Sequence, residues 1–554
     1  MKKQAVNPFL PINEYIPDGE PHVFGDRVYH YGSHDKEGGY TFCMLDYVCY
    51  SAPVNDLTDW RYEGVIYRAK NDPDYDIQPY MYAPDVVQGN DGKYYLFYCT
   101  AGDYGYEGYK GPIKVAVCDT PAGEYTYLGK VKYKDGTIME RYVCFDPGVI
   151  NDDGVIRVYY GTQYDFEEQP GFRENDALIQ EEMNMFGKTR EEIFSYDDCI
   201  MGPVMLTLED DMLTVKDEPK HIIPYKVKGT SFEKHPFFEA SSMRKVGNKY
   251  YFIYSSWENH ELCYAVSDKP DGDFVYGGTI VSNADVGYQG RDIKNKLNMT
   301  GTTHGSIIEI NGQWYVFYHR LTHKSDYSRQ ACAEKITIMP DGSIPQVNIT
   351  SCGLNKTSLK CNETYPAGIA CNITNGHMPH GCNSIFAISF PNVTHRDEDR
   401  FVGEISNGTV LGYKYFDFKT SDYEAGKKIG FEIRLDTEAT RAVYEGPIRL
   451  DGRSDEWLKQ EEAEKEERLK ELKAASDDSF MTVKAYVLPK SENSSADEIL
   501  PSNATQIACF RFDENSLSEK WMSVCENVAF DDGEYALYFS FSGSGMVQVR
   551  NIYV

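Results

Sequence analysis

The stretch Lys93-Tyr94-Tyr95-Leu96-Phe97-Tyr98 is an aromatic-rich run that follows a turn, and four modified copies of it occur in the first part of the chain. Such runs are typical of β-strands. Aligned on one tyrosine each, successive copies are 65, 65, 92 and 64 residues apart. Five strand-rich units at one period predict an all-β fold that begins with a five-bladed β-propeller. The aligned residues are Tyr29, Tyr94, Tyr159, Tyr251 and Tyr315.

The one long step falls in the third unit, where residues 166–199 form a charged, partly helical insertion. Near residue 346 the 65-residue period ends, although strand-like runs continue to the end of the chain. We therefore expect a propeller domain at 1–345 and a separate, jelly-roll-like β-sandwich at 346–554. Residues 461–475 are rich in Glu, Lys and Ala, which predicts a helical insertion near 455–478 in the second domain.

The amino-acid composition limits the classes of partner and substrate that we expect. The formal net charge is −30 and the sequence pI is about 4.8. Because a chain with this much negative charge repels other polyanions, we do not expect it to bind nucleic acid. A polyanionic polysaccharide is not an expected substrate for the same reason. The 44 tyrosines suit a neutral sugar, because flat rings stack on sugar faces while their hydroxyls form hydrogen bonds.

Targeting signals are not visible in the sequence. No apolar run approaches the roughly 18 residues that a membrane span needs. The N-terminal residues carry two lysines but no apolar segment of a signal peptide follows. We expect a cytoplasmic protein without a membrane partner, or a secreted one if a leader has been removed. The 14 cysteines include no Cys-x-x-Cys pair, so zinc or redox chemistry is only weakly indicated.

Three carboxylates stand at turns or strand starts beside apolar residues: Asp18 in Ile16-Pro17-Asp18-Gly19, Asp146 in Phe145-Asp146-Pro147, and Glu239 in Phe237-Phe238-Glu239-Ala240. Partial burial raises the pKa of a carboxyl group, whereas a neighbouring cation keeps another ionised. The three belong to units one, three and four of the repeat, so the channel of a propeller would bring them together. With no nucleophilic Ser or Cys motif beside them, they favour cleavage of a glycosidic bond. Alone, Pro17-Asp18-Gly19 is also a good turn.

Residues 7–345 resemble glycoside hydrolase family 43, whose members are five-bladed propellers acting on xylan and arabinan side chains. The resemblance rests on the order of five short motifs. Residues 346–554 resemble more loosely a family 6 carbohydrate-binding module, through residues 431–436 and 537–545. The five motifs are residues 16–21, 83–86, 145–147, 238–241 and 303–306.

The resemblance implies an inverting, single-displacement hydrolysis. Asp18 would be the general base that activates water, and Glu239 the general acid that protonates the leaving oxygen. Asp146 would orient Glu239 and keep its pKa raised. Base and acid in such enzymes stand roughly 6.5–9.5 Å apart to admit the water. The chain has Glu239-Ala240-Ser241 and Tyr82 where the family often has Glu-Gly-Pro and Trp, which leaves the substrate preference open.

Further site residues follow from the same resemblance. His304 would lie near the axis, as a substrate contact and beside a calcium ion that it reaches through water, because calcium prefers oxygen ligands. Arg320 matches a position where the family often places an arginine on the sugar. Asp85 reads as a structural carboxylate. The candidates for the pocket lining, which the sequence alone does not separate from packing residues, are His22, His34, Asp35, Tyr82 and Trp257.

The expected function is that of an exo-acting β-xylosidase or α-L-arabinofuranosidase, or both, on xylo-oligosaccharides or arabinoxylan-type oligosaccharides. An endo-arabinanase is one alternative, which would need an open groove rather than a pocket. A propeller and sandwich that only bind glycans are another. A retaining, invertase-like propeller enzyme is disfavoured, because its nucleophile and acid motifs do not occur.

Overall fold

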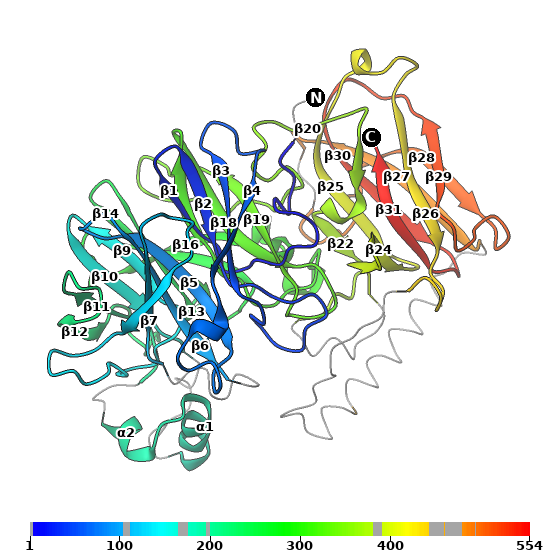
Figure 1. Cartoon of the computed structure of the whole chain (residues 1–554). Coiled ribbons are helices and arrows are strands. Elements are labelled where there is room, and N and C mark those ends of the chain that lie inside the picture. The colour runs from blue at the N-terminus through cyan, green and yellow to red at the C-terminus, as the bar shows by residue number, and fades with distance from the viewer. Residues whose placement is uncertain are drawn as a thin grey trace.

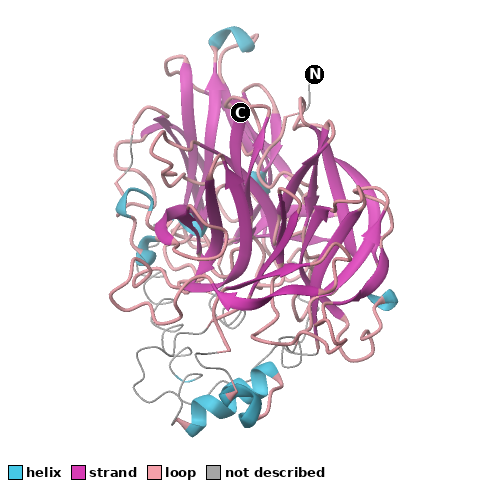
Figure 2. Ribbon diagram, turned by 90° about the vertical axis from the view of Figure 1, so that its left-hand side faces the viewer, coloured by secondary structure: helices cyan, strands magenta, loops and turns pink. Residues whose placement is uncertain are grey.

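A computed structural model describes residues 4–102, 111–163, 175–195, 200–380, 390–441, 479–492 and 495–554, together with Lys459. Strands far outnumber helices in the described structure, and the two α-helices lie together at one end of it (Figure 2). The small sheets of the first domain, coloured blue to green, stand beside the larger sheets of the second, coloured yellow to red (Figure 1). None of the helices in these ranges is long and apolar enough to cross a membrane.

Five small antiparallel sheets form the first domain as described, and each is a meander of consecutive strands. Four have four strands and the fifth has three. The blades are β1 Glu20–Phe24, β2 Arg27–Tyr31, β3 Tyr47–Pro53 and β4 Arg61–Tyr67; β5 Tyr80–Gln88, β6 Tyr94–Ala101, β7 Lys114–Cys118 and β8 Thr126–Lys130; β9 Gly148–Asp152, β10 Val155–Tyr160, β11 Val204–Leu208 and β12 Val215–His221; β13 Phe237–Val246, β14 Lys249–Ser256, β15 Glu261–Ser267 and β16 Val275–Ser282; β17 Ser306–Ile310, β18 Gln313–Leu321 and β19 Arg329–Ile336.

The five blades close into a ring. The first strands β1, β5, β9, β13 and β17 contact one another in turn, and β17 contacts β1 again. A bridge between Gly19 and Gly305 joins the first and fifth blades. A Cβ atom on Gly305 would lie 1.8 Å from the carbonyl oxygen of Phe317, so only glycine fits there. The N-terminal segment completes the ring, since the Phe9 N–H donates to the Ala331 carbonyl of β19 at 3.2 Å.

The predicted five-bladed propeller is thus confirmed, and the physical basis of the repeat is visible. All five aligned tyrosines lie in the second strand of a blade. These strands are covered on both faces by neighbouring blades, so they are apolar and aromatic over most of their length rather than alternating with polar residues. Phe97, Phe252 and Phe317 are fully buried in this way.

The long step in the repeat is an insertion between β10 and β11, and its described part includes two helices, α1 Asp176–Phe186 and α2 Arg190–Phe194. Thr189 is the N-cap of α2 and forms a capping box with Glu192. The Thr189 side chain accepts from the Glu192 N–H, and the Glu192 side chain accepts from the Thr189 N–H. The helices lie below the blade of β9–β12 in Figure 1. The partly helical insertion predicted here is confirmed for residues 175–195.

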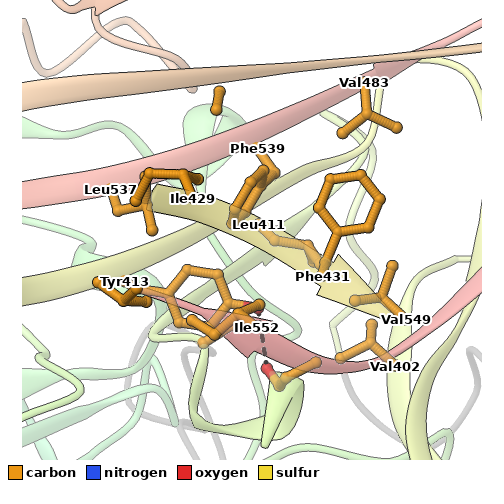
Figure 3. Packing of buried hydrophobic residues seen from close by; sticks show 14 of the residues in the cluster. Val402, Leu411, Tyr413, Ile429, Phe431, Val483, Leu537, Phe539, Val549 and Ile552 are labelled. Atoms are coloured by element: carbon orange, nitrogen blue, oxygen red, sulfur yellow. Dashed lines mark hydrogen bonds between the residues drawn. The ribbon is translucent and has the colours of Figure 1, made fainter. Parts of the chain in front are cut away.

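The second domain is a sandwich of two six-stranded sheets. Its core is a single apolar cluster between them, in which Phe431 packs against Phe539 with ring centroids 5.4 Å apart (Figure 3). One sheet contains β20 Leu359–Lys360, β22 Asn372–Thr374, β25 Val410–Phe418, β27 Met481–Pro489, β28 Thr505–Phe512 and β30 Gly533–Ser542. The other contains β21 Thr364–Pro366, β23 Asn392–Arg396, β24 Asp399–Ile405, β26 Lys428–Leu435, β29 Met522–Asn527 and β31 Val547–Tyr553.

The change from small to large sheets falls between Ile336 and Leu359, and the boundary predicted at 345/346 lies in this interval. The helical insertion predicted near 455–478 lies outside the described residues, apart from Lys459.

Candidate active site

Polar residues cluster at one end of the central channel because the first strands of the blades begin there. Asp18 precedes β1, Asp146 precedes β9, Glu239 lies near the start of β13, and His304 precedes β17. His304 Nδ1 lies 3.8 Å from Asp18 Oδ1 and 3.6 Å from Asp146 Oδ2. The Ala240 N–H donates to Asp146 Oδ2 at 3.2 Å, which links the third and fourth blades. The channel therefore unites residues that lie far apart in the sequence.

The backbone is unusual at each carboxylate. Asp18 and Asp146 have φ of 59° and 46°, and Ala240, next to Glu239, has φ of 69°. Such conformations cost about 1–3 kcal/mol each and cluster at functional sites. Register shifts on both sides of Glu239 interrupt the pairing of β13 with β14, and irregularities of this kind redirect a side chain out of the regular alternation. The turns that looked structural in the sequence thus also place the carboxylates.

Asp18 is buried and surrounded by cationic or polar neighbours. Arg329 Nη1 donates to Asp18 Oδ1 at 2.9 Å, and His319 Nδ1 lies 3.3 Å from the same oxygen. Burial by itself raises the pKa of the Asp18 carboxyl, but the Arg329 charge and the adjacent His319 outweigh burial and hold the pKa well below its usual range. Asp18 is therefore ionised at any pH near neutrality.

Glu239 and Asp146 have the opposite environment. Burial, followed by the negative charge of Asp18, raises the pKa of Glu239 to about 8. Burial also raises the pKa of Asp146 well above its usual range, and the charges of Glu239 and Asp18 add to that rise. Glu239 is only partly buried, so its carboxyl group can still meet a ligand. One carboxylate that stays ionised beside two that hold protons is an arrangement suited to paired base and acid catalysis.

Arg329 is the residue that sequence reasoning missed. Its Nε and Nη2 donate to the two oxygens of buried Asp35 at 2.8 and 2.9 Å, and its guanidinium lies 4.7 Å from the ring centroid of Phe42. The signal was its place at the start of β19, at the same end of the blade as His304.

Arg320 was predicted to contact the sugar, and its placement contradicts that prediction. Its guanidinium donates to the carbonyl oxygens of Ala370 and Cys371, at 3.1–3.3 Å, in the second domain. Side chains alternate along a strand, so in β18 His319 reaches Asp18 whereas the adjacent Arg320 points the other way.

Two of the remaining predicted residues, Tyr82 and Trp257, occupy different positions in the propeller. Tyr82, in β5, is buried and packs on Phe145, with ring centroids 5.5 Å apart, directly beside Asp146. Trp257 follows β14 at the end of the blade where Glu239 pairs with Ser255, and it is 42% exposed. These placements suit an inner wall and a rim, and both roles stay predictions.

His34 is turned toward other partners. Its Nδ1 lies 2.9 Å from the Asp46 carbonyl oxygen and its Nε2 lies 3.4 Å from Glu14 Oε2. A sugar contact would have to replace one of these partners. The next residue, Asp35, is the one that binds Arg329.

Asp85 has the structural role that the sequence suggested. Its Oδ1 lies 2.6 Å from His22 Nε2, and its Oδ2 accepts from the Val149 N–H at 2.7 Å. These bonds tie the first three blades together around the channel.

Comparisons with known proteins show the family of this chain. The model of the glycosyl hydrolases family 43 matches residues 11–193 and 201–344. This chain belongs to that family. A xylosidase/arabinosidase of Thermoclostridium stercorarium is 45% identical over 436 residues, covering 76% of this chain and 84% of the relative. Xylosidase/arabinosidase 43A of Humicola insolens is 31% identical over 354 residues, covering 60% of this chain and 97% of the relative.

A solved family 43 β-xylosidase/α-arabinofuranosidase from a compost microbial metagenome, in complex with xylotriose and in calcium-free form, is 27% identical. It covers 63% of this chain and 98% of its own, with a TM-score of 0.46. The GH43_1 enzyme of Xanthomonas citri in complex with xylose is 25% identical, covers 62% of this chain and 94% of its own, and has a TM-score of 0.47. The prediction of family 43 is confirmed.

A group of buried polar residues near His304 is a candidate ion site. Glu20 Oε1 is buried without a hydrogen-bond partner among the described residues and lies 4.0 Å from His304 Nε2. Glu20, His22 and Asp85 each offer a ligand atom within 4.8 Å of the others. Burial lowers the pKa of His304 to about 4, so its imidazole is neutral and does not repel a cation. An orphan carboxylate oxygen and a neutral histidine fit a hydrated calcium ion.

Proposed function

We propose that this protein is an inverting, exo-acting glycosidase that releases xylose, arabinose or both from neutral oligosaccharides of the plant cell wall. The observation that carries the proposal is the opposite electrostatic setting of Asp18 and Glu239. Arg329 keeps Asp18 ionised, whereas burial keeps Glu239 protonated near neutral pH. The two groups thus have the states that a single displacement needs before the substrate arrives.

In the proposed reaction, Asp18 takes a proton from a water molecule as that water attacks the anomeric carbon. Glu239 gives its proton to the departing glycosidic oxygen. Asp146 is held by the Ala240 N–H, adjacent to Glu239, so it positions the acid rather than reacting itself. The sugar is released with inverted configuration, after which Asp18 gives its proton to solvent and Glu239 takes one up.

Exo action is favoured over endo action by the insertion of the third blade. Its buried side chains include Ile179, Phe186 and Ile193, and they belong to the same apolar cluster as Tyr82 and Phe145. The helices therefore pack against the wall of the site beside Asp146. A wall at this position suits a pocket that accepts a chain end, whereas an endo-arabinanase needs an open groove.

Calcium is proposed as a structural ion of the channel, held through water near His304 and Glu20. The ion would supply positive charge close to the carboxylates and order the first strands. The calcium-free form recorded for the metagenomic relative is consistent with calcium binding in this family.

The decisive experiment measures release of nitrophenol from the β-D-xylopyranoside and the α-L-arabinofuranoside by the wild type and Glu239→Gln. Removing a general acid costs about 10²–10⁴-fold, with a smaller loss for nitrophenol because it leaves without much protonation. Xylobiose, whose leaving group is poor, serves as the demanding substrate. Proton NMR of the first-formed sugar identifies inversion.

Release of oligomers alone from linear arabinan would replace the exo proposal by an endo-arabinanase. Binding of xylo-oligosaccharides without turnover, unchanged in Glu239→Gln, would indicate a glycan-binding protein instead.

A further inference from the structure

Glu37 is a propeller residue whose charge is neutralised by the second domain. Arg400 of β24 donates to both its carboxylate oxygens, Nη1 to Oε1 at 2.9 Å and Nη2 to Oε2 at 2.8 Å. His395 of β23 lies 2.8 Å from Oε1, and the Tyr15 hydroxyl donates to the same oxygen at 2.7 Å. The Glu37 side chain is only 14% exposed. Two-point binding of a carboxylate by a guanidinium fixes both position and orientation.

The segment that carries Glu37, residues 33–46, also carries the anchor of the catalytic arginine. Asp35 stands two residues before Glu37 and accepts two hydrogen bonds from the Arg329 side chain. Asp35 Oδ1 further accepts from the Cys43 N–H at 3.0 Å, which closes the loop on itself. Arg329 in turn binds Asp18. A continuous chain of buried polar contacts thus runs from the second domain to the proposed base.

A second connection reaches the same point from the other side. Tyr15, which donates to Glu37, stands three residues before Asp18 and is fully buried. Its carbonyl oxygen accepts from the Asp35 N–H at 2.9 Å. Glu37 therefore joins two segments, the 33–46 loop and the residues that lead into Asp18, and Arg400 holds Glu37.

We propose that Arg400 is a positioning residue for the reaction: by holding Glu37 it fixes the 33–46 loop so that Asp35 keeps Arg329 against Asp18. This inference rests on the proposed function and assigns a catalytic task to the second domain that does not require it to bind glycan. Arg400 touches neither substrate nor the carboxylates at the axis. Its effect passes through Glu37, Asp35 and Arg329.

A purely stabilising domain contact would behave differently. Loss of such a contact lowers the thermal midpoint but leaves kcat of the remaining folded enzyme unchanged. Loss of a positioning contact allows Arg329 to move, so the base is less well aligned. Misplacement by about 1 Å costs roughly 10²-fold in rate.

The test compares wild type, Arg400→Met, Arg400→Lys and Arg291→Met. Arg291 is the matched control, since it also bridges the domains, its Nη1 donating to the Glu498 carbonyl at 3.1 Å, without contacting the 33–46 loop. For each protein, kcat and KM are measured from pH 4 to 9 with the nitrophenyl substrates. Backbone hydrogen exchange of residues 33–46 is followed at the same time, because it does not depend on catalysis.

We expect Arg400→Met to lower kcat/KM about 10- to 100-fold, mainly through kcat. Exchange in residues 33–46 should become faster. Lysine keeps the charge but loses two-point binding, so Arg400→Lys should be intermediate, while Arg291→Met should match the wild type in all three readouts. The double variant Glu37→Gln, Arg400→Met should lose no more kcat/KM than the more impaired of the two single variants, because both substitutions break the same contact.

The inference is overturned if Arg400→Met changes only the thermal midpoint, with kcat and the loop exchange as in the wild type. Losses equal to those of Arg291→Met would overturn it as well, because they would reflect domain association in general. If the wild type releases no pentose, the proposed function fails, and loop exchange alone decides whether Arg400 holds the 33–46 loop.

Discussion

Removal of the Arg329 guanidinium should move the proposed base into the measurable pH range. Arg329 binds both Asp18 and Asp35, so Arg329→Met alone would leave two buried carboxylates without a partner. We therefore place Arg329→Met in an Asp35→Asn background and compare it with Asp35→Asn alone. Asparagine still accepts from the Cys43 N–H, and the pair of variants isolates the effect on Asp18.

The size of the shift follows from the contacts. Breaking a buried ion pair by removing one partner costs about 3–5 kcal/mol. One pKa unit corresponds to about 1.4 kcal/mol, so the pKa of Asp18 should rise by about two units or more. Burial is the largest influence on the pKa of this carboxyl, and it is then opposed mainly by His319 and His304. Since the base must be ionised, activity is lost as the pH falls through its pKa, and a raised pKa moves the acid limb to higher pH.

The assay is kcat/KM for nitrophenol release between pH 4 and 9. The double variant should lose activity toward the acid end of this range, whereas Asp35→Asn, in which Arg329 still keeps Asp18 ionised, should show no loss from this group. The alkaline limb should move much less, because burial is the main cause of the raised pKa of Glu239. Superimposable pH profiles of the two folded variants would refute the view that Arg329 sets the charge state of the base.

Four further results are expected. Activity of the wild type should fall as the pH rises through about 8, where Glu239 loses its proton, and this limb should be absent from the residual activity of Glu239→Gln. Calcium should raise the thermal midpoint of the wild type after chelation by several degrees, and Glu20→Gln should remove most of that gain, as differential scanning fluorimetry would reveal. Gly305→Ala should destabilise the fold by about 3 kcal/mol, measured by urea unfolding, because its Cβ would meet the backbone of Phe317; an unchanged midpoint would contradict the ring closure described above. Trp257→Ala should raise KM several-fold for oligosaccharides with kcat nearly unchanged, and equal KM values would exclude this residue from the rim.

The second domain contacts the propeller near the site, and its contacts bear on whether Trp521 binds glycan. Trp521, one of its candidate aromatic residues for glycan binding, has the guanidinium groups of Arg434 and Arg550 at 4.2 and 4.9 Å from its ring centroid. Its Nε1 donates to Asp399 at 2.6 Å. Trp521 is thus engaged by charged groups of its own domain. The contact of this domain with Glu37 connects it to the segment that carries Asp35.

The amino-acid sequence by itself determined the repeat, and with it the architecture. The period of about 65 residues is the length of one blade. Because the second strand of each blade is buried on both faces, an aromatic run recurs with the same period. The three carboxylates were identifiable because each sits at a turn that opens, or interrupts, the first strand of a blade. Residues such as Asp18 and Asp146 need the left-handed backbone region, which local sequence signals through turn chemistry.

Only the tertiary structure decided which charges meet those carboxylates. Arg320 and Arg329 are both charged residues near strand ends of the fifth blade, and no local pattern separates them. The alternation of side chains along β18 sends Arg320 to the carbonyl groups of the second domain, whereas the first position of β19 brings Arg329 to Asp18. The charge states of base and acid depend on burial and on neighbours about 300 residues away in the chain. Such contacts arise from the closure of the ring, which no short segment of sequence encodes.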